Sequence, residues 1–294
     1  MSFPRTAHAL AAALEAAGLA PDRRHGQCFL TDAQAVDAIV RDAAVTAVDH
    51  VVEVGTGPGL LTHALAGTGA HVTTFDIDAR LQRFARDVEA WPATVTFVEG
   101  DVLAAKHQLS PAFAAALERE PAPEGRRLLV SNLPYNVATP ILLGVFGMAR
   151  PPQQITVMVQ REVAEKLLAP PGHAAHGAPS VLVGLAATGR ILRRFPPQVF
   201  WPRPRVDSAL LRLDPIAPSP YRSGEADAFG RFVTGLFTQR RKVLRTAAAH
   251  ALGATPAEAE AAAVAVGVDP TTRAQDVAAS DLLALWRFAG GARG

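Results

Sequence analysis

The fold is decided by the segment Val51–Leu61, which reads VVEVGTGPGLL. A run with the pattern of a buried strand passes into a glycine-rich loop and then into the apolar start of a helix. Glycines in such a loop permit positive φ angles and let the backbone approach a ligand closely, while the first N–H groups of the helix point into the site. The segment therefore predicts a nucleotide-cofactor loop in an α/β fold.

The spacing of these glycines favours S-adenosylmethionine over NAD. A dinucleotide fingerprint would place its third glycine at position 60, which is Leu60 in this chain. The pattern G-x-G-x-G, formed by Gly55, Gly57 and Gly59 with Glu53 before it, suits S-adenosylmethionine better. An NAD oxidoreductase is therefore the weakest alternative.

Two further strands are expected to end in carboxylates at the same edge of the sheet. Val72–Phe75 is followed by Asp76, and Val95–Val98 is followed closely by Asp101. In doubly wound folds an acid about 20 residues after the first glycine binds the ribose hydroxyls, which predicts this role for Asp76. Asp78 is the alternative, but Asp76 directly follows the strand. Asp101 is placed to accept from an adenine amino group.

The tetrapeptide Asn132–Tyr135 reads NLPY and meets the needs of methylation at an exocyclic amine. The lone pair of adenine N6 is delocalised into the ring, so the amine must be held by acceptors rather than deprotonated. The Asn132 carbonyl and a neighbouring backbone carbonyl suit this task, Tyr135 offers a face for an unstacked base, and Pro134 stiffens the turn. A strand with a proline turn explains the tetrapeptide alone equally well, but the ordered strand-end signals upstream favour chemistry. The predicted catalytic residues are Asn132, Leu133, Pro134 and Tyr135, with Phe200 as a candidate for the other face of the base.

In this order, the motifs resemble those of the bacterial small-subunit ribosomal RNA adenine dimethyltransferases over most of the chain. His25–Leu30 (HGQCFL) resembles the family's F-G-Q-N-F-L, and Phe200–Ala209 resembles its F-x-P-x-P-x-V-D-S-A. The chain departs from the family pattern at His25, Cys28 and His176; at position 28 a contact through the backbone would survive the change. Further matches are Val159–Val163 to L-Q-K-E-V, Phe237–Lys242 to F-x-Q-R-R-K, and Gly267–Pro270 with Arg273-Ala274 to the closing motif.

The resemblance implies a Rossmann-like enzyme that uses S-adenosylmethionine to dimethylate N6 of two adjacent adenosines. In the family these lie in the 3′-terminal hairpin of small-subunit (16S) rRNA, within an immature 30S subunit. We expect a cytoplasmic monomer that requires no metal ion. The predicted cofactor-binding residues are Cys28, Leu30, Glu53, Gly55, Gly57, Gly59, Asp76, Ile77, Asp101, Val102 and Asn132.

Two other functions fit part of the sequence. The large-subunit rRNA adenine dimethyltransferases that confer antibiotic resistance share the core motifs, but the match in the C-terminal part argues against them. An assembly factor that binds rRNA and rarely turns over belongs to a different class of protein. Retention of Asn132 and Tyr135 argues that the chemistry is kept.

Charge distribution, rather than the net charge of +2, points to RNA. Arginines gather between Arg190 and Arg212, between Arg231 and Arg245, and at Arg23-Arg24, with Asp207 as the one acid inside the first cluster. Clustered cations beside a base pocket predict phosphate contacts. The predicted RNA-binding residues are Arg23, Arg24, Arg203, Arg205, Arg240, Arg241 and Lys242.

The chain of 294 residues, 49% hydrophobic, is large enough for two modest domains. The run Pro215–Pro220 (PIAPSP) continues neither a helix nor a central strand, which predicts a boundary there. Residues 1–214 are expected to form the methyltransferase domain with an N-terminal helical extension, and residues 215–294 a helical RNA-substrate-binding domain. Helices are predicted over Phe229–Leu252, from about Pro256, and over Ser280–Phe288.

Cysteine usage and hydropathy bound the cellular context. A single cysteine excludes an internal disulfide framework and fits a reducing compartment. No signal peptide is recognisable at the N-terminus. The uncharged stretch Leu128–Ala149 contains Asn132 and Pro134, which predicts a buried strand, a turn and a helix rather than a membrane span.

Overall fold

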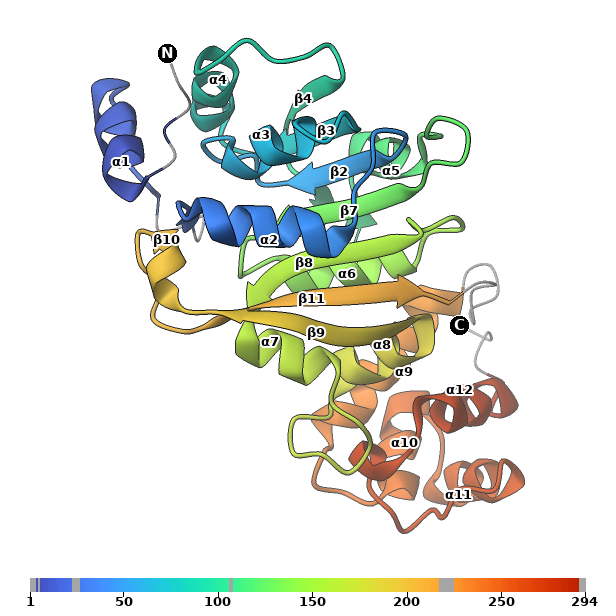
Figure 1. Ribbon diagram of the computed structural model, residues 1–294. Coiled ribbons are helices and arrows are strands. Elements are labelled where there is room, and N and C mark those ends of the chain that lie inside the picture. Colours follow the sequence, from blue (N-terminus) through green and yellow to red (C-terminus); the bar gives the residue numbers. More distant parts are fainter. Residues whose placement is uncertain (1–3, 5, 23–26, 106–107, 217–224, 291–294) are drawn as a thin grey trace. The chain divides into compact units, whose positions relative to one another are not determined.

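The computed structural model describes residues 4, 6–22, 27–105, 108–216 and 225–290. It divides into two compact units, Met1–Ala164 with Gly189–Pro215, and Glu165–Thr188 with Ile216–Gly294. We refer to them as the catalytic unit and the helical unit, and Figure 1 shows the elements of each.

The catalytic unit is built on a seven-stranded sheet with the order β4-β3-β2-β7-β8-β11-β9. Neighbours from β4 to β8 run parallel, and β11 pairs antiparallel with β8. The strands are β2 His50–Val54, β3 His71–Asp76, β4 Val95–Glu99, β7 Arg127–Asn132, β8 Gln154–Gln160, β9 Ala187–Phe195 and β11 Ser208–Pro215. The expected Rossmann-like fold is confirmed.

The strand order creates a crevice at the carboxyl end of β2. From β2 the chain builds outward through β3 and β4, and then returns to add β7 on the other side of β2. In open α/β sheets the loops diverge at such a switch point, and ligands bind there. Short strands β1 Phe29–Leu30 and β10 Phe200–Trp201 pair antiparallel, and β5 Leu103–Ala105 pairs with β6 Gln108–Leu109.

Helices cover both faces of this sheet (Figure 1). Apolar side chains from α2 and α3 pack against Val51, Leu128 and Met158 of the strands, so the buried strand pattern of the sequence becomes the core. Asp32 caps α2, and Ser110 caps α5. The helices are α1 Ala7–Ala16, α2 Ala33–Ala43, α3 Leu60–Ala66, α4 Ala79–Asp87, α5 Pro111–Glu118 and α6 Ala138–Phe146, with η2 Pro197–Val199. Helix α7 Arg161–Leu167 begins in this unit and ends in the helical unit.

The uncharged stretch Leu128–Ala149 folds as predicted into a buried strand, a turn and a helix. It comprises most of β7, the NLPY turn and α6. Within the described ranges, no helix has the length and apolar character of a membrane span.

The helical unit packs its own core around Phe229, Leu236 and Trp286. The predicted start of a helix at Pro256 is confirmed, since Thr255 and Glu258 form a capping box. Its elements are α8 Ala178–Ala186, α9 Glu225–Thr238, α10 Leu244–Leu252, α11 Pro256–Ala265, η3 Ala274–Asp276 and α12 Ala279–Phe288.

Two features of this unit differ from the sequence prediction. The helix expected over Phe229–Leu252 is broken, because the Leu244 N–H donates to the Thr272 carbonyl at 2.7 Å instead of continuing the helical ladder. Segment Glu165–Thr188, expected in the methyltransferase domain, groups with the helical unit. Val181 and Leu185 of α8 share the core of that unit, which explains the grouping.

Candidate active site

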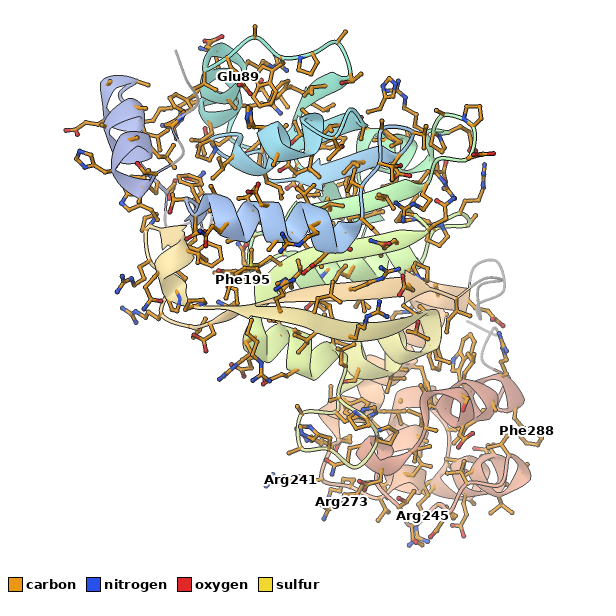
Figure 2. The ribbon with its side chains drawn as sticks, viewed as in Figure 1. Glu89, Phe195, Arg241, Arg245, Arg273 and Phe288 are labelled. Carbon is orange, nitrogen blue, oxygen red and sulfur yellow. The ribbon has the colours of Figure 1, made fainter. Side chains whose placement is uncertain are left out.

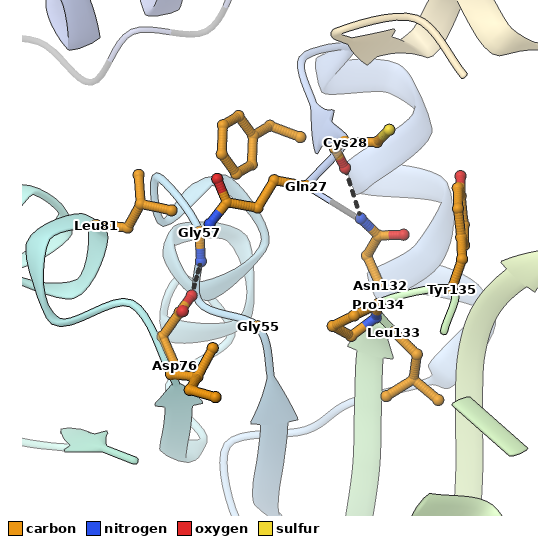
Figure 3. Close-up of a pocket in the computed structure, with 12 residues that line it drawn as sticks. Gln27, Cys28, Gly55, Gly57, Asp76, Leu81, Asn132, Leu133, Pro134 and Tyr135 are labelled. Atoms are coloured by element: carbon orange, nitrogen blue, oxygen red, sulfur yellow. Dashed lines mark hydrogen bonds between the residues drawn. The ribbon is translucent and has the colours of Figure 1, made fainter. Parts of the chain in front are cut away.

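A pocket lies at the carboxyl ends of β2, β3 and β7 (Figure 3). The glycine loop, the end of β3 and the NLPY turn meet there, together with the segment that leads into β1. Residues far apart in the sequence thus share one site, as the switch point predicts. The lining consists of Gln27, Cys28, Phe29, Gly55, Gly57, Asp76, Ile77, Leu81, Asn132, Leu133, Pro134 and Tyr135.

The glycine loop owes its shape to backbone angles that side chains rarely adopt. Gly55 and Gly57 have φ angles of 79° and 53°. The N–H groups of Gly55 and Thr56 donate to the Phe75 carbonyl at 2.7 and 3.1 Å, which ties the loop to the end of β3. A Cβ atom on Gly57 would stand 3.2 Å from the Phe29 ring. The loop therefore lies close against Phe29, another residue of the pocket lining.

The carboxylate of Asp76 is fixed in the pocket by backbone donors. Its Oδ2 accepts from the Gly57 N–H at 2.7 Å, and its Oδ1 accepts from the Asp78 N–H at 2.8 Å. Asp78 is used differently: it caps α4 and pairs with Arg80 at 3.0 Å, and the Arg80 hydrogen bond is the main cause that lowers the pKa of its carboxyl. Of the two aspartates proposed for the ribose, Asp76 is the one that lines the pocket.

Glu53 lies beneath the loop and does not line the pocket. It is 1% exposed, and its Oε2 accepts from the Thr62 hydroxyl of α3 at 2.6 Å. Burial is the main cause that raises the pKa of this carboxyl to about 8. Its side chain is therefore placed to hold the loop and α3 together.

The other predicted cofactor residues divide between the pocket and its surroundings. Cys28, Ile77 and Asn132 line it, and Ile77 is 53% exposed. Asp101 is exposed and accepts from the Leu103 N–H at 2.9 Å. Leu30, Gly59 and Val102 are buried and are not among the lining residues.

Asn132 is held by one end of its amide only. Its Nδ2 donates to the Cys28 backbone carbonyl at 3.2 Å. Its Oδ1 is buried and has no hydrogen-bond partner among the described residues. Since the Cys28 carbonyl only accepts, the amide must turn its nitrogen toward it, and the oxygen then points toward Tyr135 (Figure 3). A backbone carbonyl makes this contact, so cysteine in place of the family's asparagine leaves it intact.

The side chain of Tyr135 lines the same pocket as Asn132. Its hydroxyl lies 2.9 Å from Ser208 Oγ, and burial raises the pKa of the phenol to about 12, so it is neutral at physiological pH. Phe200, the candidate for the second stacking face, is 3% exposed and packs in the core of the catalytic unit. In β10, Phe200 pairs with Leu30, and Phe200 is not among the lining residues; its role as a second stacking face stays a prediction.

Three lining residues were not predicted. Gln27 and Phe29 belong to the HGQCFL motif, which indicated a cofactor contact, but the prediction named only their neighbours Cys28 and Leu30. Gln27 accepts from the Asp22 N–H at 2.7 Å. Leu81 comes from the apolar face of α4, and no local pattern distinguishes it from an ordinary core position.

The predicted RNA-binding residues lie on both units. Arg203 and Arg205 are exposed in the catalytic unit, and Arg241 and Lys242 are exposed in the turn between α9 and α10. Arg240 is exposed too, but it donates to the Ala174 carbonyl and, at 3.0 Å, to Gln275 Oε1. It therefore fastens a loop of its own unit. Arg23, Arg24 and His25 lie outside the described residues.

Two further arginines extend the basic turn of the helical unit. Val243 forms an antiparallel bridge with Arg273, and the Arg245 N–H donates to the Pro270 carbonyl at 3.1 Å. Figure 2 shows Arg241, Arg245 and Arg273 at one end of this unit. Arg245 also lies 3.5 Å from Glu260.

A parallel sheet with a glycine loop after β2, a fixed carboxylate after β3 and an NLPY turn after β7 defines a Rossmann-like S-adenosylmethionine-dependent methyltransferase. The model of one family, ribosomal RNA adenine dimethylase, matches residues 21–289. The chain belongs to this family.

Relatives with similar sequences cover nearly the whole chain. The ribosomal RNA small subunit methyltransferase A of Bifidobacterium longum is 37% identical over 97% of this chain and 94% of its own length. The protein of the same name from Phenylobacterium zucineum is 40% identical over 93% and 90%. These relatives support the family assignment along both units.

Two solved structures share the fold. A dimethyladenosine transferase from Plasmodium falciparum aligns with a TM-score of 0.68 at 20% identity, over 87% of this chain and 96% of its own. The 23S rRNA methyltransferase ErmE aligns with a TM-score of 0.60 at 24% identity, over 89% and 99%. At these identities the likeness shows the fold alone.

Proposed function

We propose that this enzyme dimethylates N6 of two adjacent adenosines in the 3′-terminal hairpin of small-subunit rRNA, within an immature 30S subunit. The observation that carries the proposal is the buried Oδ1 of Asn132, an acceptor with no partner among the described residues, in the pocket that Tyr135 also lines. The small-subunit relatives support the choice of RNA. We further propose that it acts as a cytoplasmic monomer without a metal ion.

The residues of the pocket fit S-adenosylmethionine. Asp76 presents a fixed carboxylate to a ribose diol, and the exposed Ile77 and the buried Leu81, which both line the pocket, offer apolar contact to an adenine ring. The backbone of Gly55 and Gly57 lines the pocket, and glycine has no side chain of its own to keep a ligand away from that backbone. When bound, the cofactor supplies an electrophilic sulfonium methyl group.

The chain's own residues then act by positioning. Asn132 Oδ1 accepts an N6 hydrogen of the flipped adenine, and a neighbouring backbone carbonyl accepts the other, which aims the nitrogen lone pair at the methyl group. Tyr135 stacks on the base. Its phenol, with a pKa of about 12, serves no role as a base at neutral pH. The rate therefore depends on orientation and on a preorganised acceptor.

The basic turn of the helical unit supports RNA contact. Arg241 and Lys242 are exposed, and Arg273 is bridged to the same turn through Val243. Exposed cations at one end of a unit neutralise phosphates with a strong dependence on salt. Arg203 and Arg205 would contribute from the catalytic unit.

The experiment offers the enzyme two RNAs. Small subunits from cells that lack this modification should acquire two methyl groups on each of two neighbouring adenines, as read by mass analysis of the rRNA. Free large-subunit rRNA should not be methylated. Preference for large-subunit rRNA would assign the enzyme to the resistance type, and tight binding of small subunits without methyl transfer would favour the assembly factor.

A further inference from the structure

We infer that Ser208 is a positioning residue for methyl transfer, because its hydroxyl fixes the Tyr135 ring in the orientation on which the target base stacks. The inference rests on the proposed function, in which Tyr135 receives that base. It adds to the site a residue on the antiparallel strand β11.

The hydrogen bond joins two side chains that differ in how deeply they are buried. Ser208 is 0% exposed and lies 2.9 Å from the Tyr135 hydroxyl, whereas Tyr135 is half-buried at the pocket wall. The hydroxyl contact at its far end is therefore placed to restrict the tilt of the ring.

Ser208 is a rigid point of attachment. It begins β11 and stands opposite Gln160 in the antiparallel ladder with β8. One residue earlier, the Asp207 carbonyl accepts from the Arg161 N–H at 2.9 Å. One residue later, Ala209 is paired with Val159, and both are fully buried. The backbone on either side of Ser208 is thus fixed by the sheet.

The NLPY turn is fastened at both of its functional ends. Asn132 is anchored to the Cys28 carbonyl, and Tyr135 is anchored to Ser208. One anchor is Ser208 of β11, and the other is the Cys28 carbonyl in the segment before β1, so the two come from different parts of the chain. Together the two anchors fix the orientation of the Tyr135 ring, on which the base stacks, relative to the Asn132 Oδ1 acceptor. Removal of either anchor displaces one group relative to the other, and small displacements of this kind slow reactions that depend on orientation.

The test is a double-mutant cycle with Tyr135→Phe and Ser208→Ala. Both variants keep the stacking ring and remove the same hydrogen bond. Each should lower the single-turnover rate about three- to tenfold, the range expected for one neutral hydrogen bond. The double variant should be no slower than the slower single variant. Affinity for S-adenosylmethionine, measured by calorimetry, should stay within about twofold because neither group contacts Asp76 or the glycine loop.

Ser180→Ala is the matched control. Ser180 is also a buried serine, and its hydroxyl donates to the Lys166 carbonyl at 2.6 Å in the helical unit. It should lower the thermal midpoint comparably and leave the rate unchanged. Ser208→Thr retains the hydroxyl and should recover most of the rate.

Three results would overturn the inference: a wild-type rate in Tyr135→Phe, multiplicative losses in the double variant, or an equal reduction of rate in Ser180→Ala. The ratio of variant to wild-type rate is measured on whichever rRNA the wild-type enzyme prefers. If the proposed substrate is incorrect, the wild-type enzyme will prefer another rRNA. If the positioning role is incorrect, the ratio of variant to wild-type rate will not change as expected.

Discussion

Replacing Asn132 with alanine should slow single-turnover methylation about 100-fold, equivalent to about 2.7 kcal/mol of transition-state stabilisation. The magnitude follows from the structure, since Oδ1 is the buried acceptor left for the amine and alanine offers no substitute. The same change removes the 3.2 Å hydrogen bond to the Cys28 carbonyl, which should cost about 0.5 to 1.5 kcal/mol of folding stability. Affinity for S-adenosylmethionine should change only a few-fold, because Asp76 and the glycine loop are untouched.

The assay follows one methyl transfer to small subunits with the enzyme in excess, while calorimetry measures the cofactor affinity. Gln154→Ala is the matched control: Gln154 is also a buried amide, and its Nε2 donates to the Ala43 carbonyl at 2.9 Å, at the start of β8 rather than beside the pocket. That variant should lose stability and keep its rate. A second variant, Asn132→Asp, should not recover the rate, because a carboxylate cannot donate to the Cys28 carbonyl.

Near-normal turnover in Asn132→Ala would refute the positioning role. An equal reduction of rate in Gln154→Ala would show that the effect arises from a general decrease in stability. A large decrease in cofactor affinity in Asn132→Ala would move Asn132 from the acceptor role to cofactor binding.

Asp76→Ala should weaken S-adenosylmethionine binding about tenfold or more, since a charge-assisted hydrogen bond contributes roughly 1.5 to 3 kcal/mol, whereas Asp78→Ala should not; calorimetry showing weaker binding only in Asp78→Ala would transfer the role. The pKa of Glu53 is about 8 in the fold and ordinarily 4.5, so the stability that its protonated form confers is complete below pH 4.5 and is lost as the pH rises through 8. Glu53→Gln should therefore flatten the decline of the free energy of unfolding between about pH 4.5 and about pH 8, and parallel profiles in denaturant titrations would contradict this linkage. Replacing Arg241 and Lys242 with Gln, and leaving the loop-holding Arg240 in place, should lower the log-log salt slope of RNA binding by about 0.7 to 0.9 for each phosphate that is no longer neutralised; an unchanged slope would exclude phosphate binding by this pair.

The sequence by itself determined the features that depend on neighbouring residues. The strand, loop and helix around Val51–Leu61 follow from apolar pattern and glycine placement, and the capping box at Thr255 follows from side chains three residues apart. The order of strand ends then placed Asp76 and Asn132 in one pocket, because carboxyl ends of parallel strands share one edge of a sheet.

Only the tertiary structure decided which side chains of these motifs reach the pocket. Glu53 and Phe200 belong to recognisable motifs, yet neither is among the lining residues: the Glu53 carboxylate accepts from the Thr62 hydroxyl, and Phe200 is 3% exposed in the core of the catalytic unit. Segment Glu165–Thr188 joined the helical unit through the core that α8 shares with it.

The hydrogen-bond partners that anchor the NLPY turn also could not be predicted from the sequence. Cys28 and Asn132 are 104 positions apart, and Tyr135 and Ser208 are 73 apart. Local patterns specify helices, strands and turns, but they carry no information on which distant carbonyl or hydroxyl a side chain meets. The packing of β1, β7 and β11 brings these groups together, and so the tertiary structure, not the motif, orients the acceptor and the stacking ring.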